Sequence, residues 1–245
     1  MAAATAAAGW AAWTTKDEPE TLPSHLTTSR RSPKRERLFY LPKRHFLYSM
    51  YITWKHKHTA LTAASPLDRK IEVFRERIWG WQLHVADLMA NGGRDHDNAK
   101  EVALLPHSGF AVLQVLLSYF ETIAHYESGD TSEQSARFFK AGVRSVFPEL
   151  NQYPYLLVSN FLDHLYSAAR CGLYHMSMTK PNIAIGNVAN AVQFEDHPPR
   201  ITLNPHKLPG VLKSHLDAYT ARLMNPAEVD LREKFRRRFE YDYKS

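Results

Sequence analysis

The chain has 245 residues, 44% of them hydrophobic, and a formal net charge of +6. This length suits one domain with a tail, and the single cysteine, Cys171, excludes an internal disulfide framework and any cysteine-rich zinc module. The longest apolar stretch, Phe110 to Phe120, is about half of the roughly 20 residues that a membrane-spanning helix needs, so we expect a cytoplasmic protein with no membrane span.

Residues 1–64 combine alanine runs, basic clusters and scattered aromatic residues without a sustained helical or strand period. This composition predicts a disordered basic and aromatic N-terminal arm, followed by a helical domain at 65–245. The composition changes near Met50. One hypothesis is therefore that residues 1–49 are an upstream extension of a shorter protein.

The positive charge belongs to this arm. Nine Lys or Arg residues lie between Arg30 and His58 against one acid, Glu36, whereas residues 59–245 carry 21 basic and 21 acidic residues. Basic and aromatic side chains interleave in the arm, which predicts binding to phosphates and stacking on bases. The alternative is attachment to an acidic membrane surface. The candidate nucleic-acid-binding residues are Arg35, Arg37, Lys43 and Arg44.

Hydrophobic spacing in the first half of the domain predicts four helices. Ser65 caps the first helix, with Pro66 in its first position, and a cap at Thr131 or Ser132 begins the third. The second helix is apolar on nearly every side, which is typical of the central helix of a bundle. The four helices are expected at about residues 65–88, 110–126, 131–147 and 155–175.

Three short β-like runs follow, at residues 183–185, 192–194 and 201–203, and they predict a small hairpin. Two further helices are expected at about 208–223 and 229–241; Asn225 and Pro226 form the cap and first position of the last one. The fold class is therefore mainly α, a helical bundle with a small β-hairpin inserted before the last two helices.

The candidate chemistry lies in the fourth helix, because glycine-rich phosphate loops, nucleophile elbows and zinc-binding helices are missing from the sequence. At 100° per residue, an apolar stripe runs along this helix. Arg170 and His175 fall on opposite flanks of the stripe, about 140° apart, where both can reach another helix or subunit. Gly172 lies between them and weakens the helix.

Two structural interpretations of this segment stay open. Asp163 lies beside Arg170 on the same helical wheel, so the two can form an ion pair two turns apart. Cys171 and His175 have the spacing of two metal ligands, but no third ligand is near them in the sequence, so we expect no metal. The basic run Arg236–Arg238 is expected to be a solvated helix face.

An arginine followed five residues later by a histidine, at the end of a long helix, resembles the hallmark of the HEPN superfamily. The wider sequence looks like a group of uncharacterised bacterial HEPN-like proteins over roughly residues 70–240. The segments that carry this likeness are Tyr119–Tyr126, Phe138–Pro148, Ala169–His175, Leu203–His206 and Leu231–Phe235. At the position after the arginine, nuclease members commonly have a polar residue, whereas this chain has Cys171.

The resemblance implies a symmetric homodimer that brings two Arg–His sets into one cleft, and a metal-independent endoribonuclease without a cofactor. In that activity His175 exchanges a proton with the ribose 2′-hydroxyl or the leaving oxygen, and Arg170 holds the phosphate. Glu121 and His125 on the central helix are candidate supporting residues, together with Asp163; a Glu121 bonded to a neighbouring helix is the structural alternative.

Many members of the superfamily retain the helices but not the activity. The alternative function is therefore a non-catalytic helical module that binds a nucleotide or a protein partner, with Arg170 in a structural role. The partner type that the resemblance implies is an antitoxin or a nucleotidyltransferase-type protein. A metal-dependent hydrolase is a third and more distant alternative.

Overall fold

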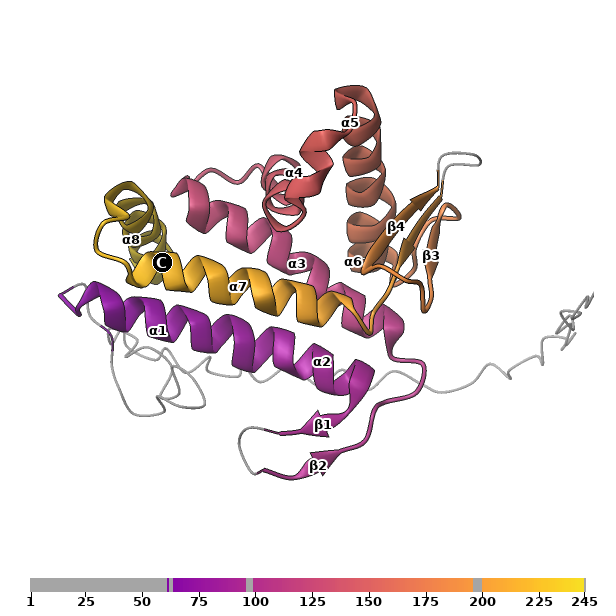
Figure 1. Cartoon of the computed structure of the whole chain (residues 1–245), viewed down its shortest axis with the longest axis horizontal. Helices are drawn as coiled ribbons and strands as arrows, with labels where there is room; N and C mark the ends of the chain where they lie inside the picture. Colours follow the sequence, from indigo (N-terminus) through magenta and orange to yellow (C-terminus); the bar gives the residue numbers. More distant parts are fainter. Residues whose placement is uncertain (1–60, 62–63, 96–98, 196–199, 245) are drawn as a thin grey trace, which may run out of the picture. The chain divides into compact units, whose positions relative to one another are not determined.

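The computed structural model describes residue 61 and residues 64–95, 99–195 and 200–244. The described part is mainly helical, as the sequence predicts, with six helices and small sheets that include a three-stranded sheet before the last two helices (Figure 1). The expected arm lies almost entirely outside the described residues, as do Met50 and the four candidate nucleic-acid-binding residues Arg35, Arg37, Lys43 and Arg44.

Two of the six helices are rods of three successive segments with a π-helical turn in the middle. The first rod consists of α1 (Leu67–Ile78), η1 (Trp79–Leu83) and α2 (His84–Asn91). The second rod consists of α5 (Tyr155–His164), η3 (Leu165–Arg170) and α6 (Cys171–Met176). Both extents match the sequence prediction, but neither π turn was predicted.

The other helices are α3 (Gly109–Ser128), α4 (Ser135–Val146), α7 (Leu208–Met224) and α8 (Val229–Lys244). A 3-10 turn, η2 (Pro148–Gln152), joins α4 to the second rod. Three predicted starts differ from the structure. Pro66 precedes α1 rather than opening it. Helix α4 begins at Ser135 and not directly after Thr131 or Ser132, because the Asp130 carboxylate accepts the Ser132 N–H and closes a turn there. Helix α8 begins at Val229 and not at Pro226, because the Asn225 side chain accepts the Ala227 N–H and closes a similar turn.

Helix α3 is the central helix, as predicted. Its side chains are buried on several sides, and it packs against α2, α4, α7 and α8. Burying a large apolar side chain contributes about 1.5–3 kcal/mol, so α3 holds much of the core stabilisation. The fully buried members of α3 include Leu113, Leu116, Tyr119, Phe120 and Ile123.

Helices α3 and α4 lie in close contact at Gly142. A Cβ atom at this position would lie 1.8 Å from the backbone oxygen of Phe120. The two backbones can therefore touch only because residue 142 has no side chain. The edge-to-face contact of Phe120 with Phe139, at 5.5 Å between ring centroids, completes this pairing.

The sheet contains the predicted hairpin and one additional strand. β4 (Val192–Glu195) and β5 (Arg200–Leu203) pair antiparallel, and β3 (Ile183–Ile185) pairs parallel to β5, giving the order β3-β5-β4. Two short strands alone are marginally stable, so the third strand and the contact with the second rod support the hairpin. A two-residue pair, β1 (Gly93–Arg94) and β2 (Glu101–Val102), was not predicted.

The basic run on α8 is not simply a solvated face. Arg237 donates to the carbonyl of Gly129 at 2.8 Å, and Arg238 donates to the carbonyl of Asp130 at 3.0 Å. Carbonyls at the C-terminal end of α3 have no partner within their own helix, and they attract cations. Arg236 does face solvent, paired with Glu233.

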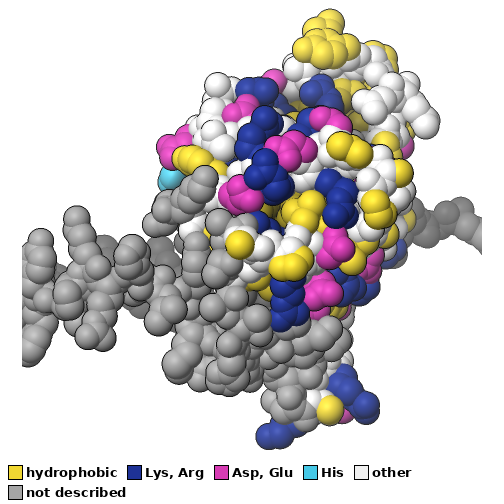
Figure 2. Space-filling model, turned by 90° about the vertical axis from the view of Figure 1, so that its left-hand side faces the viewer, with side chains coloured by type: hydrophobic (Ala, Val, Ile, Leu, Met, Phe, Trp, Pro, Cys, Tyr) yellow, Lys and Arg dark blue, Asp and Glu magenta, His cyan; other side chains and the backbone are white. Residues whose placement is uncertain are grey.

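Acidic and basic side chains are interspersed on the face shown in Figure 2, in keeping with the balanced charge of residues 59–245. Ion pairs one turn apart occur on α8, for example Lys234 with Asp230 and Arg236 with Glu240. Among the described residues, no helix is both long enough and apolar enough to span a membrane.

Candidate functional site

Arg170 ends the π turn of the second rod and points toward α3. Its Nη2 donates to Oε2 of Glu121 at 2.9 Å, and both side chains remain about one-fifth exposed, at 20% and 23%. The guanidinium also lies over the ring of Tyr174, at 4.9 Å from its centroid. Glu121 is thus bonded to a neighbouring helix, and it fixes the position of Arg170 while leaving part of the guanidinium open to solvent.

His175 lies in the last turn of α6 and is exposed. Within the described residues, its recorded contact is with the neighbouring ring of Tyr174, at 5.5 Å between centroids. Tyr174 therefore lies between the two predicted catalytic groups and contacts both of them.

The backbone around this pair is held by the loop that follows α6. The N–H of Lys180 donates to the carbonyl of Ala168, in the π turn, at 3.1 Å. The loop also passes close to Gly172, where a Cβ atom would lie 2.6 Å from the carbonyl oxygen of Met178. Gly172 therefore allows this close return of the chain.

The apolar stripe of the second rod is buried as predicted, but the ion pair of Asp163 with Arg170 that the helical wheel allows does not form. Asp163 pairs with Lys140 of α4 instead. A π turn accommodates about one extra residue, so residues beyond it are rotated relative to a regular helix. This rotation directs Arg170 toward Glu121, whereas Asp163, which precedes the turn, stays beside α4. The stripe consists of Val158, Phe161, Leu162, Leu165, Ala169 and Leu173.

His125 is buried on the side of α3 that faces α4 and α8. Its ring stacks on Phe138 at 3.8 Å between centroids, and its Nδ1 lies 3.2 Å from Nη1 of Arg238. Burial, and then the positive charge of Arg238, lower the pKa of His125. These contacts give His125 a packing role. Within the described residues no cluster of metal-ligating side chains occurs, and Cys171 is a free thiol.

A partly buried polar network links α3, α4 and α7, and the sequence reasoning missed it. Tyr119 Oη lies 2.9 Å from His215 Nδ1, and His215 Nε2 lies 3.1 Å from Ser145 Oγ. Ser145 in turn donates to Glu127 at 2.7 Å. A signal was present, because His215 lies between Leu212, Leu216 and Tyr219 on the buried face of α7.

The direction of the hydrogen bonds decides what this network can do. Ser145 donates to Glu127, so its oxygen accepts from Nε2–H of His215, and Nδ1 then accepts the hydroxyl hydrogen of Tyr119. In this arrangement His215 cannot take a proton from Ser145. Burial lowers the pKa of His215 and raises that of Glu127, although the bond from Ser145 opposes the shift at Glu127. The network is therefore a structural tie rather than an activated serine.

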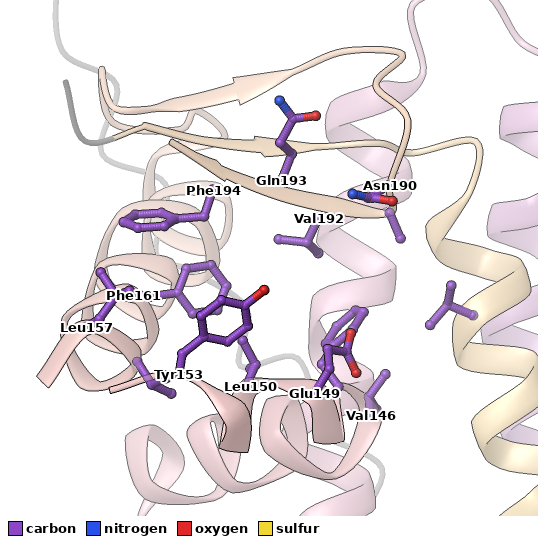
Figure 3. Close-up of a pocket in the computed structure, with 14 residues that line it drawn as sticks. Val146, Glu149, Leu150, Tyr153, Leu157, Phe161, Asn190, Val192, Gln193 and Phe194 are labelled. Atoms are coloured by element: carbon purple, nitrogen blue, oxygen red, sulfur yellow. The ribbon is translucent and has the colours of Figure 1, made fainter. Parts of the chain in front are cut away.

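A cavity of about 550 Å³ lies between η2, α5 and β4, and neither Arg170 nor His175 lines it (Figure 3). At the end of the second rod, His175 is exposed and Arg170 is partly exposed. No protein-family model, curated protein or solved structure matches this chain. The function therefore has to be argued from the geometry of the chain itself.

Proposed function

We propose that this protein is a HEPN-like, metal-independent endoribonuclease. In this proposal two copies pair so that their Arg170 and His175 side chains share a cleft, and RNA is cut by attack of a ribose 2′-hydroxyl on the adjacent phosphodiester. The observation that carries the proposal is the end of the second rod, where an anchored but partly exposed arginine and an exposed histidine flank one exposed tyrosine, Tyr174.

Arg170 is suited to holding a phosphate without losing its structural partner. A guanidinium has five N–H donors, and the bond to Glu121 uses a single donor. The carboxylate of Glu121 fixes the orientation of the guanidinium, and the remaining donors can bind phosphate oxygens while charge grows on them. Glu121 thus acts as a positioning residue in this proposal.

His175 supplies the proton transfer. Its exposed imidazole has no side chain of the described residues bonded to it, so it is free to approach a 2′-hydroxyl or a leaving oxygen. Tyr174, 63% exposed, offers a ring on which a base of the RNA can stack next to the scissile phosphate. The basic residues Arg35, Arg37, Lys43 and Arg44 would add contacts to the RNA backbone.

One observation favours the alternative, a non-catalytic helical module. The ion pair of Arg170 with Glu121 ties the second rod to the central helix, and this role explains the arginine without any substrate. The module would bind a nucleotide or a protein partner and would need no free imidazole. The two functions therefore differ in what they require of His175.

The test is incubation of the full-length protein with single-stranded RNA in excess chelator. We expect products that end in a cyclic phosphate, and a loss of cleavage of about 100-fold or more in His175→Ala, since general acid–base catalysis contributes about 10²- to 10⁴-fold. Arg170→Ala should also lose activity. His107→Asn is the matched control, because it removes another exposed imidazole and Asn tolerates the positive φ of 61° at that position.

Equal cleavage by the wild type and His175→Ala would mean that a contaminant cuts the RNA, and the enzyme proposal would fail in favour of the module. Activity that disappears with chelator would point to a metal-dependent hydrolase. Light scattering tests the dimer separately: a protein that stays monomeric at the concentration of the cleavage assay contradicts the shared cleft.

A further inference from the structure

The cavity described above is bounded by elements far apart in the sequence. The end of α4, the 3-10 turn η2 and helix α5 form one wall, and strand β4 forms the opposite wall. In Figure 3, Tyr153 and Glu149 rise from the η2 side, while Val192 and Phe194 face them from β4. Its volume of about 550 Å³ falls within the range of small-molecule sites.

The walls of the cavity are apolar and rich in aromatic rings. Phe161 and Phe194 meet edge to face, with 5.7 Å between their centroids, and Phe147 packs on Phe120 of the core at 6.1 Å. These two contacts hold the rings of Phe161, Phe194 and Phe147 in place. The fourth ring, Tyr153, is 56% exposed at the rim, so it can adjust to an occupant. An occupant therefore has an apolar body that contacts ring faces.

The charge of the lining residues indicates whether an apolar ligand of this cavity is cationic, neutral or anionic. Glu149 is the charged residue of the lining, and none of the lining residues, all of them described, is Lys, Arg or His. No ion pair or hydrogen bond of the Glu149 carboxylate occurs within the described residues. A carboxylate beside aromatic rings favours a cation, through charge attraction and cation–π contact, and disfavours phosphates and carboxylates.

We propose that this cavity binds a small hydrophobic amine, with its apolar body between Phe161, Phe194 and Leu150 and its ammonium group at Glu149 beside the Tyr153 ring. The amide side chain of Asn190, just before β4, supplies a further hydrogen-bonding group, whereas Gln193 points to the other side of the strand (Figure 3). The site is separate from Arg170 and His175, and the proposal does not depend on RNA cleavage. It also disfavours a nucleotide as the occupant, because its phosphate would be repelled by Glu149.

Three probes that share one apolar body and differ in charge test the proposal: phenylbutylamine, phenylbutanol and phenylbutyrate. Each is titrated into the full-length protein, and binding is followed by the backbone amide resonances of residues 149–153 and 192–195. We expect the amine to bind most tightly and the acid most weakly. Glu149→Gln should weaken amine binding by about 2- to 5-fold, the range of a solvent-exposed ion pair, and leave the alcohol unchanged.

Glu195→Gln is the matched control. Glu195 is an exposed carboxylate on β4 that does not line the cavity, so its substitution should leave the order of the probes and the amine affinity as in the wild type. The proposal is overturned if the acid binds as tightly as the amine, if Glu149→Gln leaves amine affinity unchanged, or if the amine shifts resonances only outside these segments. Absence of amine binding at millimolar concentration overturns it as well.

Discussion

Gly142→Ala is the substitution whose effect follows most directly from the packing of the core. The added Cβ atom would lie 1.8 Å from the carbonyl oxygen of Phe120, and also 2.5 Å from its carbonyl carbon. All three nearest atoms belong to the backbone of α3, so no side chain can rotate away. Helices α3 and α4 must separate instead, by more than about 1 Å, before the contact is tolerable.

The expected cost combines two opposing effects. Overpacking a close-packed core costs about 1–3 kcal/mol, and a backbone clash of this depth belongs at the upper end of that range. Replacing glycine by alanine inside a helix returns about 0.5–1 kcal/mol. We therefore expect Gly142→Ala to lower the free energy of unfolding by about 2 kcal/mol.

Urea unfolding followed by far-UV circular dichroism measures this loss. With a typical dependence of 1–3 kcal/mol per molar urea, the midpoint should fall by roughly 1 M. Gly210→Ala on α7 is the control, because a Cβ atom there has no neighbour within 4 Å, and this variant should be as stable as the wild type or slightly more stable. Equal midpoints for the wild type and Gly142→Ala would refute the close contact of α3 with α4.

Two further predictions concern His215, which is partly buried, and His125, which is buried. Tyr119→Phe removes the hydroxyl that bonds His215 Nδ1, so it should cost about 1–3 kcal/mol in the same urea assay, whereas the exposed Tyr241→Phe should cost less than about 0.5 kcal/mol. Acidification from about pH 7.5 to about pH 5 should lower the unfolding temperature, because the pKa values of His215 and His125 are below the unfolded value, and the unfolded chain takes up protons first as the pH falls. Glu127 has the opposite effect, because its pKa is raised and its contribution to stability is lost as the pH rises through the folded pKa. An unfolding temperature that stays constant over this pH interval contradicts the assignment to the histidines.

The positions of the helices and of the three strands β3, β4 and β5 could be predicted from the sequence. Hydrophobic spacing is a local property, and each predicted segment overlaps an observed one, including the buried stripe of the second rod. The glycine at position 172 could also be singled out from its place in a helix. The reason why glycine is needed there could not be predicted, because the carbonyl of Met178 approaches Gly172 only in the folded chain.

The partners of the candidate site residues were decided by tertiary structure. Arg170 bonds Glu121, 49 residues away in the sequence, rather than Asp163 on its own helix. A helical wheel assumes a constant 100° per residue, and the π turn of the second rod breaks that assumption within the segment that carries the motif. Once the π turn has rotated the helix, sequence periodicity no longer indicates which carboxylate lies opposite Arg170.

The partly buried network of Tyr119, His215, Ser145 and Glu127 and the aromatic cavity beside β4 also arise only in the fold. Each of them joins side chains from at least three elements, and single-sequence patterns describe one element at a time. The sequence by itself determined which faces are apolar, because burial of apolar surface is the dominant and non-directional force. Hydrogen bonds are directional and short-ranged, so the tertiary structure alone decided which polar groups meet.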